Sequence, residues 1–142
     1  MISMKKIILL TCVLFTTLLL RAQKGSWIIK LNNKTICSTW QEDAKKNVKK
    51  IKSTDWKKSG KLEIIFTEDE KNTWMRSFQF VDEQDNDILR KDSTLHATLS
   101  LVELRRLFAG KKKLTIYTTI SPLDPGIAIR IRRVHLCTLQ LP

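Results

Sequence analysis

Apolar and polar residues alternate most regularly between residues 114 and 141, and this pattern predicts two β-strands joined by a turn. Residues 114–120 are mostly β-branched, aromatic or aliphatic, which suits a half-buried sheet surface. After a turn that contains proline and glycine, apolar residues alternate with small or charged ones over 127–131. The apolar parity then changes, so one continuous strand needs local breaks near 132–133 and 137–138, which β-bulges provide.

A β-hairpin is predicted near the start of the polar part of the chain. Residues 26–31 alternate between apolar and other side chains, and a second extended stretch follows at 35–39. The asparagines and lysine at 32–34 favour a tight turn, because asparagine tolerates the positive φ that such turns demand. The second strand of the hairpin would bring Cys37 into the sheet.

The same period of two predicts further strands in the middle of the chain. Residues 61–67 place three apolar side chains on one face, and residues 74–80 follow after a polar turn. Arg76 shares a face with the aromatic residues of the latter strand, so we expect it to meet an acid or to extend past them to water. An acidic loop at 82–87 leads towards another extended stretch at 95–99.

One helix is predicted at about 101–109. Ser100 and Glu103 match the capping box, in which each side chain binds a free amide at the helix start. Leucine and phenylalanine then recur at helical spacing, and Gly110 provides a stop. Together with the strands, this helix predicts a mainly β, single-domain, antiparallel β-sandwich-like fold.

Residues 40–61 leave two interpretations open. Apolar side chains recur at helical spacing from Trp40 onwards. Residues 47–52 equally fit a short edge strand, since lysine at a sheet edge discourages pairing with other chains. Residues 54–56 then suggest a single helical turn that ends at Ser59-Gly60.

The first 22 residues form a predicted signal peptide. Two lysines precede an apolar stretch at 7–20, and Ala22 supplies a small residue at the exit, a pattern that resembles bacterial signal peptides. An uncleaved membrane anchor is the alternative, but the stretch is shorter than the ~20 residues that span a bilayer. We therefore expect residues 23–142 to form one secreted or periplasmic domain with no transmembrane span after cleavage.

Charge limits the partners of such a domain. The 142 residues carry a formal net charge of +12, and removal of residues 1–22 lowers it to +9. A strongly basic protein is attracted to anions. The candidate partners are therefore an anionic envelope polymer or an acidic protein, with nucleic acid less favoured.

Lysines are concentrated between residues 45 and 61, where they outnumber acids eight to one. Two tryptophans interleaved with this segment offer flat apolar contacts for a sugar or a base if they are exposed. We interpret the segment as a binding face for anionic partners, although a solvated surface produces the same pattern. The predicted binding residues are Lys45, Lys46, Lys49, Lys50, Lys52, Lys57, Lys58, Lys61, Trp40 and Trp56.

Cys37 and Cys137 are the cysteines that remain after removal of the signal peptide. In an oxidising compartment an even count is typical of a disulfide. A bond that closes a loop of about a hundred residues would stabilise the fold by up to roughly 4.7 kcal/mol in the chain-entropy model. Two buried free thiols, which pack as small apolar groups, are the alternative.

Residues with metal-binding or catalytic chemistry are sparse. His135 and Cys137 share a strand face and His96 is the other histidine, whereas a zinc or copper site needs three or four ligands. The carboxylates at 82–87 lack the EF-hand pattern, and the sequence contains no glycine-rich phosphate loop or nucleophile elbow. We therefore expect neither a metal nor a cofactor.

These patterns favour an exported, non-catalytic binding or envelope-accessory protein. The alternative is a small secreted hydrolase acting on envelope polymers, because the carboxylates of such enzymes meet only in the folded structure. Convergent carboxylates in a cleft, or a serine or cysteine beside His96 or His135, would favour the hydrolase. A basic face without such groups would favour binding.

Overall fold

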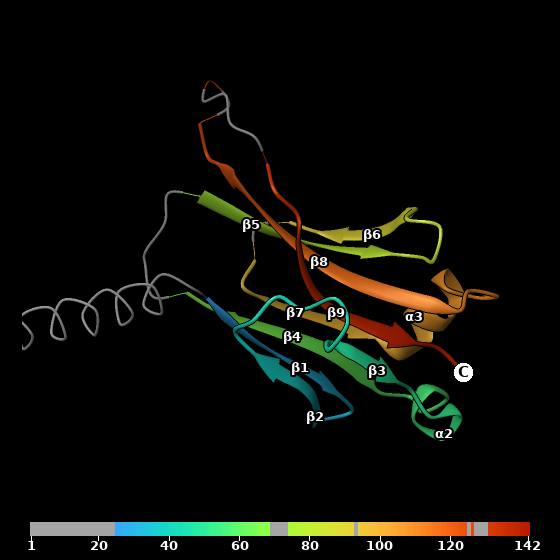
Figure 1. The fold of residues 1–142 in the computed structure, drawn as a ribbon. Coiled ribbons are helices and arrows are strands. Elements are labelled where there is room, and N and C mark those ends of the chain that lie inside the picture. Colours follow the sequence, from blue (N-terminus) through green and yellow to red (C-terminus); the bar gives the residue numbers. More distant parts are fainter. Residues whose placement is uncertain (1–24, 69–73, 93, 125, 127–130) are drawn as a thin grey trace, which may run out of the picture.

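The computed structural model describes residues 25–68, 74–92, 94–124, 126 and 131–142. Over these residues the chain forms two β-sheets packed face to face, with two short helices towards one end (Figure 1). The mainly β, sandwich-like fold predicted from the alternation is confirmed. The predicted signal peptide and the alternating residues 127–130 lie outside the described residues. No helix within the described ranges has the length and hydropathy needed to cross a bilayer.

The first sheet is antiparallel and has the strand order β2-β1-β4-β7. Its strands are β1 (Ser26–Leu31), β2 (Lys34–Thr39), β4 (Lys61–Thr67) and β7 (His96–Ser100). The predicted hairpin joins β1 to β2. Asn32 and Asn33 have φ values of 52° and 68°, the positive region that a two-residue hairpin turn requires.

The second sheet has the strand order β3-β9-β8-β5-β6. Its strands are β3 (Val48–Lys50), β5 (Trp74–Val81), β6 (Asp87–Lys91), β8 (Lys113–Pro122) and β9 (Val134–Gln140). Neighbouring strands are antiparallel except β3 and β9, which are parallel. Strands β8 and β9 are the two that the strongest alternation predicts.

The register of β8 and β9 corrects the predicted strand breaks. It shifts just after Ile116, where Leu136 is the extra residue of a bulge on β9. Leu136 and Cys137 are therefore both fully buried although they are adjacent. The bulge predicted near 137–138 therefore lies one residue earlier, and residues 131–133 precede the strand.

The hydrophobic core lies between the two sheets and uses alternate side chains of their strands. Trp27, Ile29 and Leu31 of β1 point into it, as the alternation predicts. Trp27 also joins the sheets by a hydrogen bond, since its indole Nε1–H donates to the Leu136 carbonyl at 3.1 Å. This bond satisfies two polar groups that would otherwise be buried without partners.

Helix α3 (Leu101–Leu107) confirms the predicted helix but not its predicted cap. Ser100 makes no side-chain cap hydrogen bond. The Leu101 amide donates to the Gly60 carbonyl at 2.9 Å, so a distant backbone group satisfies one of the free amides of the first turn. Gly110 has a φ of 75°, as expected for the residue that ends a helix.

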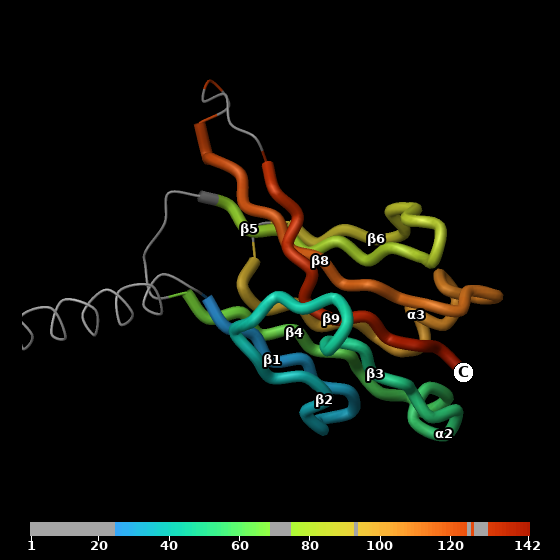
Figure 2. Tube along the Cα trace, in the orientation of Figure 1, coloured from blue at the N-terminus to red at the C-terminus, as the bar shows by residue number. Residues whose placement is uncertain are grey.

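Residues 40–61 form an edge strand and a helical turn, so the helix predicted from Trp40 is wrong. The Asp43 carboxylate accepts hydrogen bonds from the amides of Lys45 and Lys46 at 3.0 and 3.1 Å, which makes a turn there. Figure 2 shows this segment crossing from β2 in the first sheet to β3 in the second. The four-residue helix α2 (Ser53–Trp56) follows β3.

The predicted disulfide is not formed, because Cys37 and Cys137 are buried free thiols. Strand β2 carries Cys37 in the first sheet and β9 carries Cys137 in the second, so the thiols meet across the core. They are hydrogen-bond partners and are not at bonding distance. This hydrogen bond lowers the pKa of Cys37 and raises the pKa of Cys137.

Candidate functional site

All eight lysines between residues 45 and 61 are exposed, and we call them the lysine face. They are Lys45, Lys46, Lys49, Lys50, Lys52, Lys57, Lys58 and Lys61. They run from the turn before β3, through β3 at the edge of the second sheet and through α2, to the start of β4 in the first sheet (Figure 1). The structure therefore places the predicted lysines along one edge of the sandwich.

Most of the positive charge on the lysine face is not neutralised by acids. Lys58 Nζ lies 3.5 Å from Asp55 and Lys61 Nζ lies 3.1 Å from Glu63. Within the described part of the chain, the other six amines form no ion pair. Their fields add at the surface and attract anions.

Four lysines surround a hollow of about 230 Å³ between the β1–β2 turn and α2, which we call the basic hollow. They are Lys34, Lys50, Lys52 and Lys58. Asp55 is the single acid among its lining residues, and Lys58 already pairs with it. Sequence reasoning missed Lys34, because this residue belongs to the earlier hairpin and approaches α2 only through the fold.

Asn32 holds the basic hollow together. Its side-chain amide donates to the Asp55 carbonyl at 3.2 Å, and its side-chain oxygen accepts from the Lys61 amide at 3.1 Å. Gly60 leaves room for this side chain, since a Cβ built at Gly60 would lie 1.6 Å from Asn32 Oδ1. The hairpin tip is thus joined to both α2 and β4.

Helix α2 is anchored on its other side by Trp56 and Arg105. Trp56 is only 8% exposed, so the exposure on which a contact between this indole and a ligand depends is not met. Arg105 of α3 donates to the carbonyls of Trp56 and Lys58 at 2.6 and 2.8 Å. These carbonyls belong to the end of α2, where helix carbonyls lack helical partners. The buried Trp56 therefore positions the neighbouring lysines. Trp40, by contrast, is 40% exposed and keeps the exposure that a ligand contact requires.

The histidines of the described residues are not arranged for hydrolysis. His135 Nε2 meets the Thr138 hydroxyl at 2.8 Å, but its buried Nδ1 has no partner, so no third group orients the ring. Burial lowers the pKa of His135, which keeps the ring neutral. His96 is exposed and its Nε2 lies 3.3 Å from Glu63, without a nucleophile between them.

Glu42 and Asp43 are adjacent carboxylates, but neither has the raised pKa that a general acid needs. Burial raises the pKa of Glu42, yet hydrogen bonds from the His135 amide and from Arg132 lower it overall. The amides of Lys46 and Lys45 lower the pKa of Asp43. Both groups are ionised acceptors near neutral pH.

The carboxylate at the start of the acidic loop holds the conformation of the loop. Asp82 accepts hydrogen bonds from Lys111 Nζ at 2.9 Å and from the amides of Gln84 and Asn86 at 2.9 Å. The Asn86 side chain donates to its second oxygen at 3.0 Å. Across the described ranges, no three histidine, cysteine or carboxylate side chains gather as metal ligands.

Comparisons of the chain with family models, with curated proteins and with solved structures found no match.

Proposed function

We propose that the protein is an exported, non-catalytic binding protein whose lysine face holds an anionic envelope polymer. The basic hollow carries this proposal, because lysines from three separate segments converge there around one acid that is already paired. Cations that surround a hollow contact an anionic group from several sides, whereas scattered surface charges attract it only diffusely.

The rest of the lysine face extends the contact beyond the hollow. Lys45, Lys46 and Lys49 continue along the turn and β3, so successive anionic groups of one polymer can meet successive amines. Linked contacts of this kind raise the overall affinity above that of one site. Exposed charges are screened over about 8 Å at physiological ionic strength, so binding should weaken steeply as salt is added.

Retention on heparin-agarose, a sulfated polysaccharide matrix, tests this function. The triple variant Lys49→Gln, Lys50→Gln, Lys52→Gln should elute at a clearly lower salt concentration than the wild type. The slope of log affinity against log salt should fall by roughly 0.7–0.9 for each lysine that contacts the polymer. The thermal midpoint should stay nearly unchanged, since all three positions are exposed.

A matched control removes the same charge from other parts of the surface. It is the triple variant Arg90→Gln, Lys91→Gln, Arg106→Gln, on β6 and α3. Equal losses of retention in the two triple variants would show diffuse attraction and overturn the proposal. Soluble competitors separate the partner classes: if poly-L-glutamate displaces the protein at a lower charge concentration than free heparin, an acidic protein is the better partner and the polymer proposal fails.

Export is part of the proposal, because an envelope polymer is met only outside the cytoplasm. The intact mass of the protein from its native host should correspond to loss of 22 or 23 residues. A full-length product retained in the membrane fraction would contradict export.

A further inference from the structure

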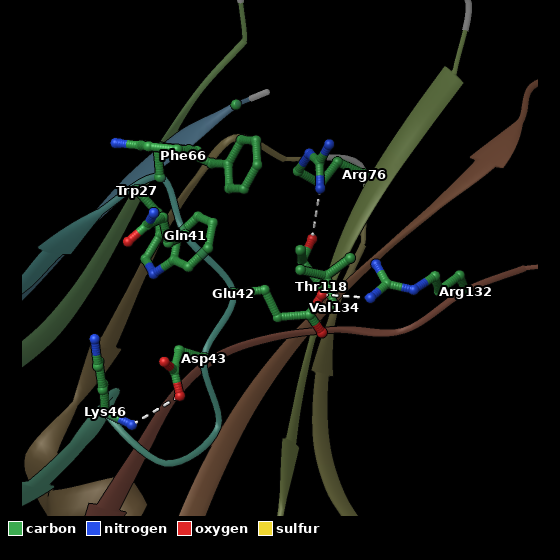
Figure 3. Close-up of a pocket in the computed structure, with 12 residues that line it drawn as sticks. Trp27, Gln41, Glu42, Asp43, Lys46, Phe66, Arg76, Thr118, Arg132 and Val134 are labelled. Carbon is green, nitrogen blue, oxygen red and sulfur yellow. Dashed lines mark hydrogen bonds and ion pairs between the residues drawn. The ribbon is translucent and has the colours of Figure 1, made fainter. Parts of the chain in front are cut away.

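A second hollow, of about 680 Å³, opens between the two sheets near the start of β1, and we call it the mouth cavity (Figure 3). Its volume lies within the roughly 300–1,000 Å³ of small-molecule sites. Its lining comes from both sheets and from the segment between β2 and β3. The lining residues that matter here are Trp27, Trp40, Glu42, Phe66, Arg76 and Arg132.

Aromatic side chains form one wall of the mouth cavity. Trp27 and Phe66 are stacked, with ring centroids 6.0 Å apart and an interplanar angle of 13°. The indole hydrogen bond to Leu136 fixes the Trp27 ring in this orientation. Trp40 lines the same cavity and is 40% exposed, so it offers an accessible apolar surface.

Arg76 supplies polar groups beside the aromatic wall, and it meets an acid, which is one of the two alternatives that the sequence leaves open. Its Nε donates to Glu68 Oε1 at 2.6 Å and its Nη1 donates to the Thr118 hydroxyl at 3.0 Å. The guanidinium carbon lies 3.8 Å from the Phe66 ring centroid, which is a cation–π contact. The charge of this arginine is therefore already balanced.

The opposite side of the cavity carries a second balanced pair. Arg132 forms an ion pair with Glu42, and Figure 3 shows these two side chains pointing toward each other. The other oxygen of Glu42 accepts a hydrogen bond from the His135 amide at 3.1 Å. Asp43 and Lys46 lie next to this pair and carry opposite charges.

The mouth cavity therefore combines flat apolar surface, hydrogen-bond donors and acceptors, and paired charges. An anionic ligand would lie against Glu42 and Asp43, and it would compete with Glu42 for Arg132 and with Glu68 for Arg76. A fully apolar ligand would bury these polar groups without new partners, which is costly. A neutral ligand that has both hydroxyl groups and an apolar face fits all three properties.

We propose that the mouth cavity binds a short neutral saccharide. A sugar ring has an apolar face of C–H groups, which stacks on the exposed Trp40 indole. Its hydroxyl groups donate to the carboxylate of Glu42 and accept from Gln41 and the arginines. This site is separate from the basic hollow and does not depend on the anionic-polymer proposal, since none of its lining residues lines that hollow.

Titration of the protein with maltotriose, cellotriose, xylotriose and chitotriose tests the proposal. Tryptophan fluorescence and calorimetry should show binding of at least one probe with a Kd of about 1 mM or tighter. Trp40→Ala should weaken that binding roughly tenfold, because truncating a central aromatic contact removes much of the interaction. Gln41→Ala is a second variant at an exposed position and should weaken binding several-fold.

Two controls distinguish the mouth cavity from the basic hollow and a neutral ligand from an anionic one. The double variant Lys50→Gln, Lys52→Gln should leave saccharide binding unchanged; if it abolishes binding, the sugar occupies the basic hollow and the proposal is overturned. Failure of all four probes to bind also overturns it, as does unchanged binding in folded Trp40→Ala. Tighter binding of trigalacturonate than of the neutral probes would show that the ligand is anionic and would contradict neutrality.

Discussion

The Arg105 guanidinium donates a hydrogen bond to the Trp56 carbonyl at 2.6 Å and so fixes α2 against α3. The two residues are 49 positions apart in the chain. Because Lys57 and Lys58 directly follow Trp56, this contact fixes the backbone from which their side chains extend. The geometry of the lysine face thus depends on an arginine outside it.

Arg105→Ala should lower the free energy of unfolding by about 1.5–3 kcal/mol, the usual contribution of hydrogen bonds to a charged group. Urea denaturation monitored by tryptophan fluorescence measures this change. Arg106→Ala, on the exposed side of the same helix, should change stability by no more than about 0.5 kcal/mol. Similar losses in the two variants would mean that Arg105 acts only through net charge or helix propensity.

Gly60→Ala should displace the Asn32 side chain, because the new Cβ would lie 1.6 Å from Asn32 Oδ1. The hydrogen bonds from Asn32 to Asp55 and from Lys61 to Asn32 would then be lost, at a cost of about 1–3 kcal/mol. Thermal unfolding measures stability, and retention on heparin-agarose measures anion binding by the basic hollow. Ser59→Ala, at the exposed neighbouring position, should alter neither. Unchanged retention in folded Gly60→Ala would show that the shape of the hollow does not matter for binding.

Asp82 should make the protein sensitive to acid. Its pKa in the folded state lies well below the ordinary value of 3.8, chiefly because Lys111 donates to its carboxylate. As the pH falls, Asp82 is protonated first in the unfolded chain, so the stabilisation is complete above about pH 5 and is lost as the pH falls towards the lower pKa of the folded state. The difference in thermal midpoint between the wild type and Asp82→Asn should therefore narrow between pH 5 and pH 2.

The exposed Asp87 provides the control for this pH dependence. Asp87→Asn removes one negative charge at the end of the same loop and should follow the wild-type curve. A constant difference between the wild type and Asp82→Asn across this pH range would contradict the assigned role of Asp82.

The two core thiols should be unreactive in the folded protein and free after unfolding. Cys37 is 6% exposed and Cys137 is fully buried, so a disulfide-exchange reagent such as DTNB should label neither at short times in protein lacking residues 1–22. Denaturation without reductant should release two thiols, and Cys37→Ala should release one. If no thiol is released until reductant is added, the cysteines have become bonded.

Local features of the sequence predict local features of the fold. The hairpin turn follows from the tolerance of Asn32 and Asn33 for positive φ. The strand at 61–67 follows from the alternation of apolar and other side chains within it. The side-chain cap predicted for α3 is not formed, and the partner of the Leu101 amide is the distant Gly60 carbonyl, which no nearby residue reveals.

The candidate sites depend on the order of the strands in the two sheets, and the alternation within a single strand carries no information about that order. Exposure of the lysines follows from their charge, but the approach of Lys34 to α2 requires β2 and β3 to lie at the same side of the two sheets. The burial of Trp56 likewise depends on the packing of α2 against the fold. The mouth cavity could not be predicted from the sequence, because its walls come from both sheets and no single segment contains enough of its lining residues to reveal it.

The parallel pairing of β3 with β9 has a consequence for the order in which the chain folds. Val48 lies beside Thr138, ninety positions later, and the Thr138 amide donates to the Asn47 carbonyl at 2.8 Å. Strand β3 therefore has no sheet partner until β9 has been synthesised, and the hydrogen bond from Trp27 to Leu136 must wait for the same strand. Contacts so distant in sequence form slowly. We therefore expect the first sheet to be able to form before the chain is complete, whereas β3 and the packing of Trp27 against the second sheet are fixed only when the last strand has been made.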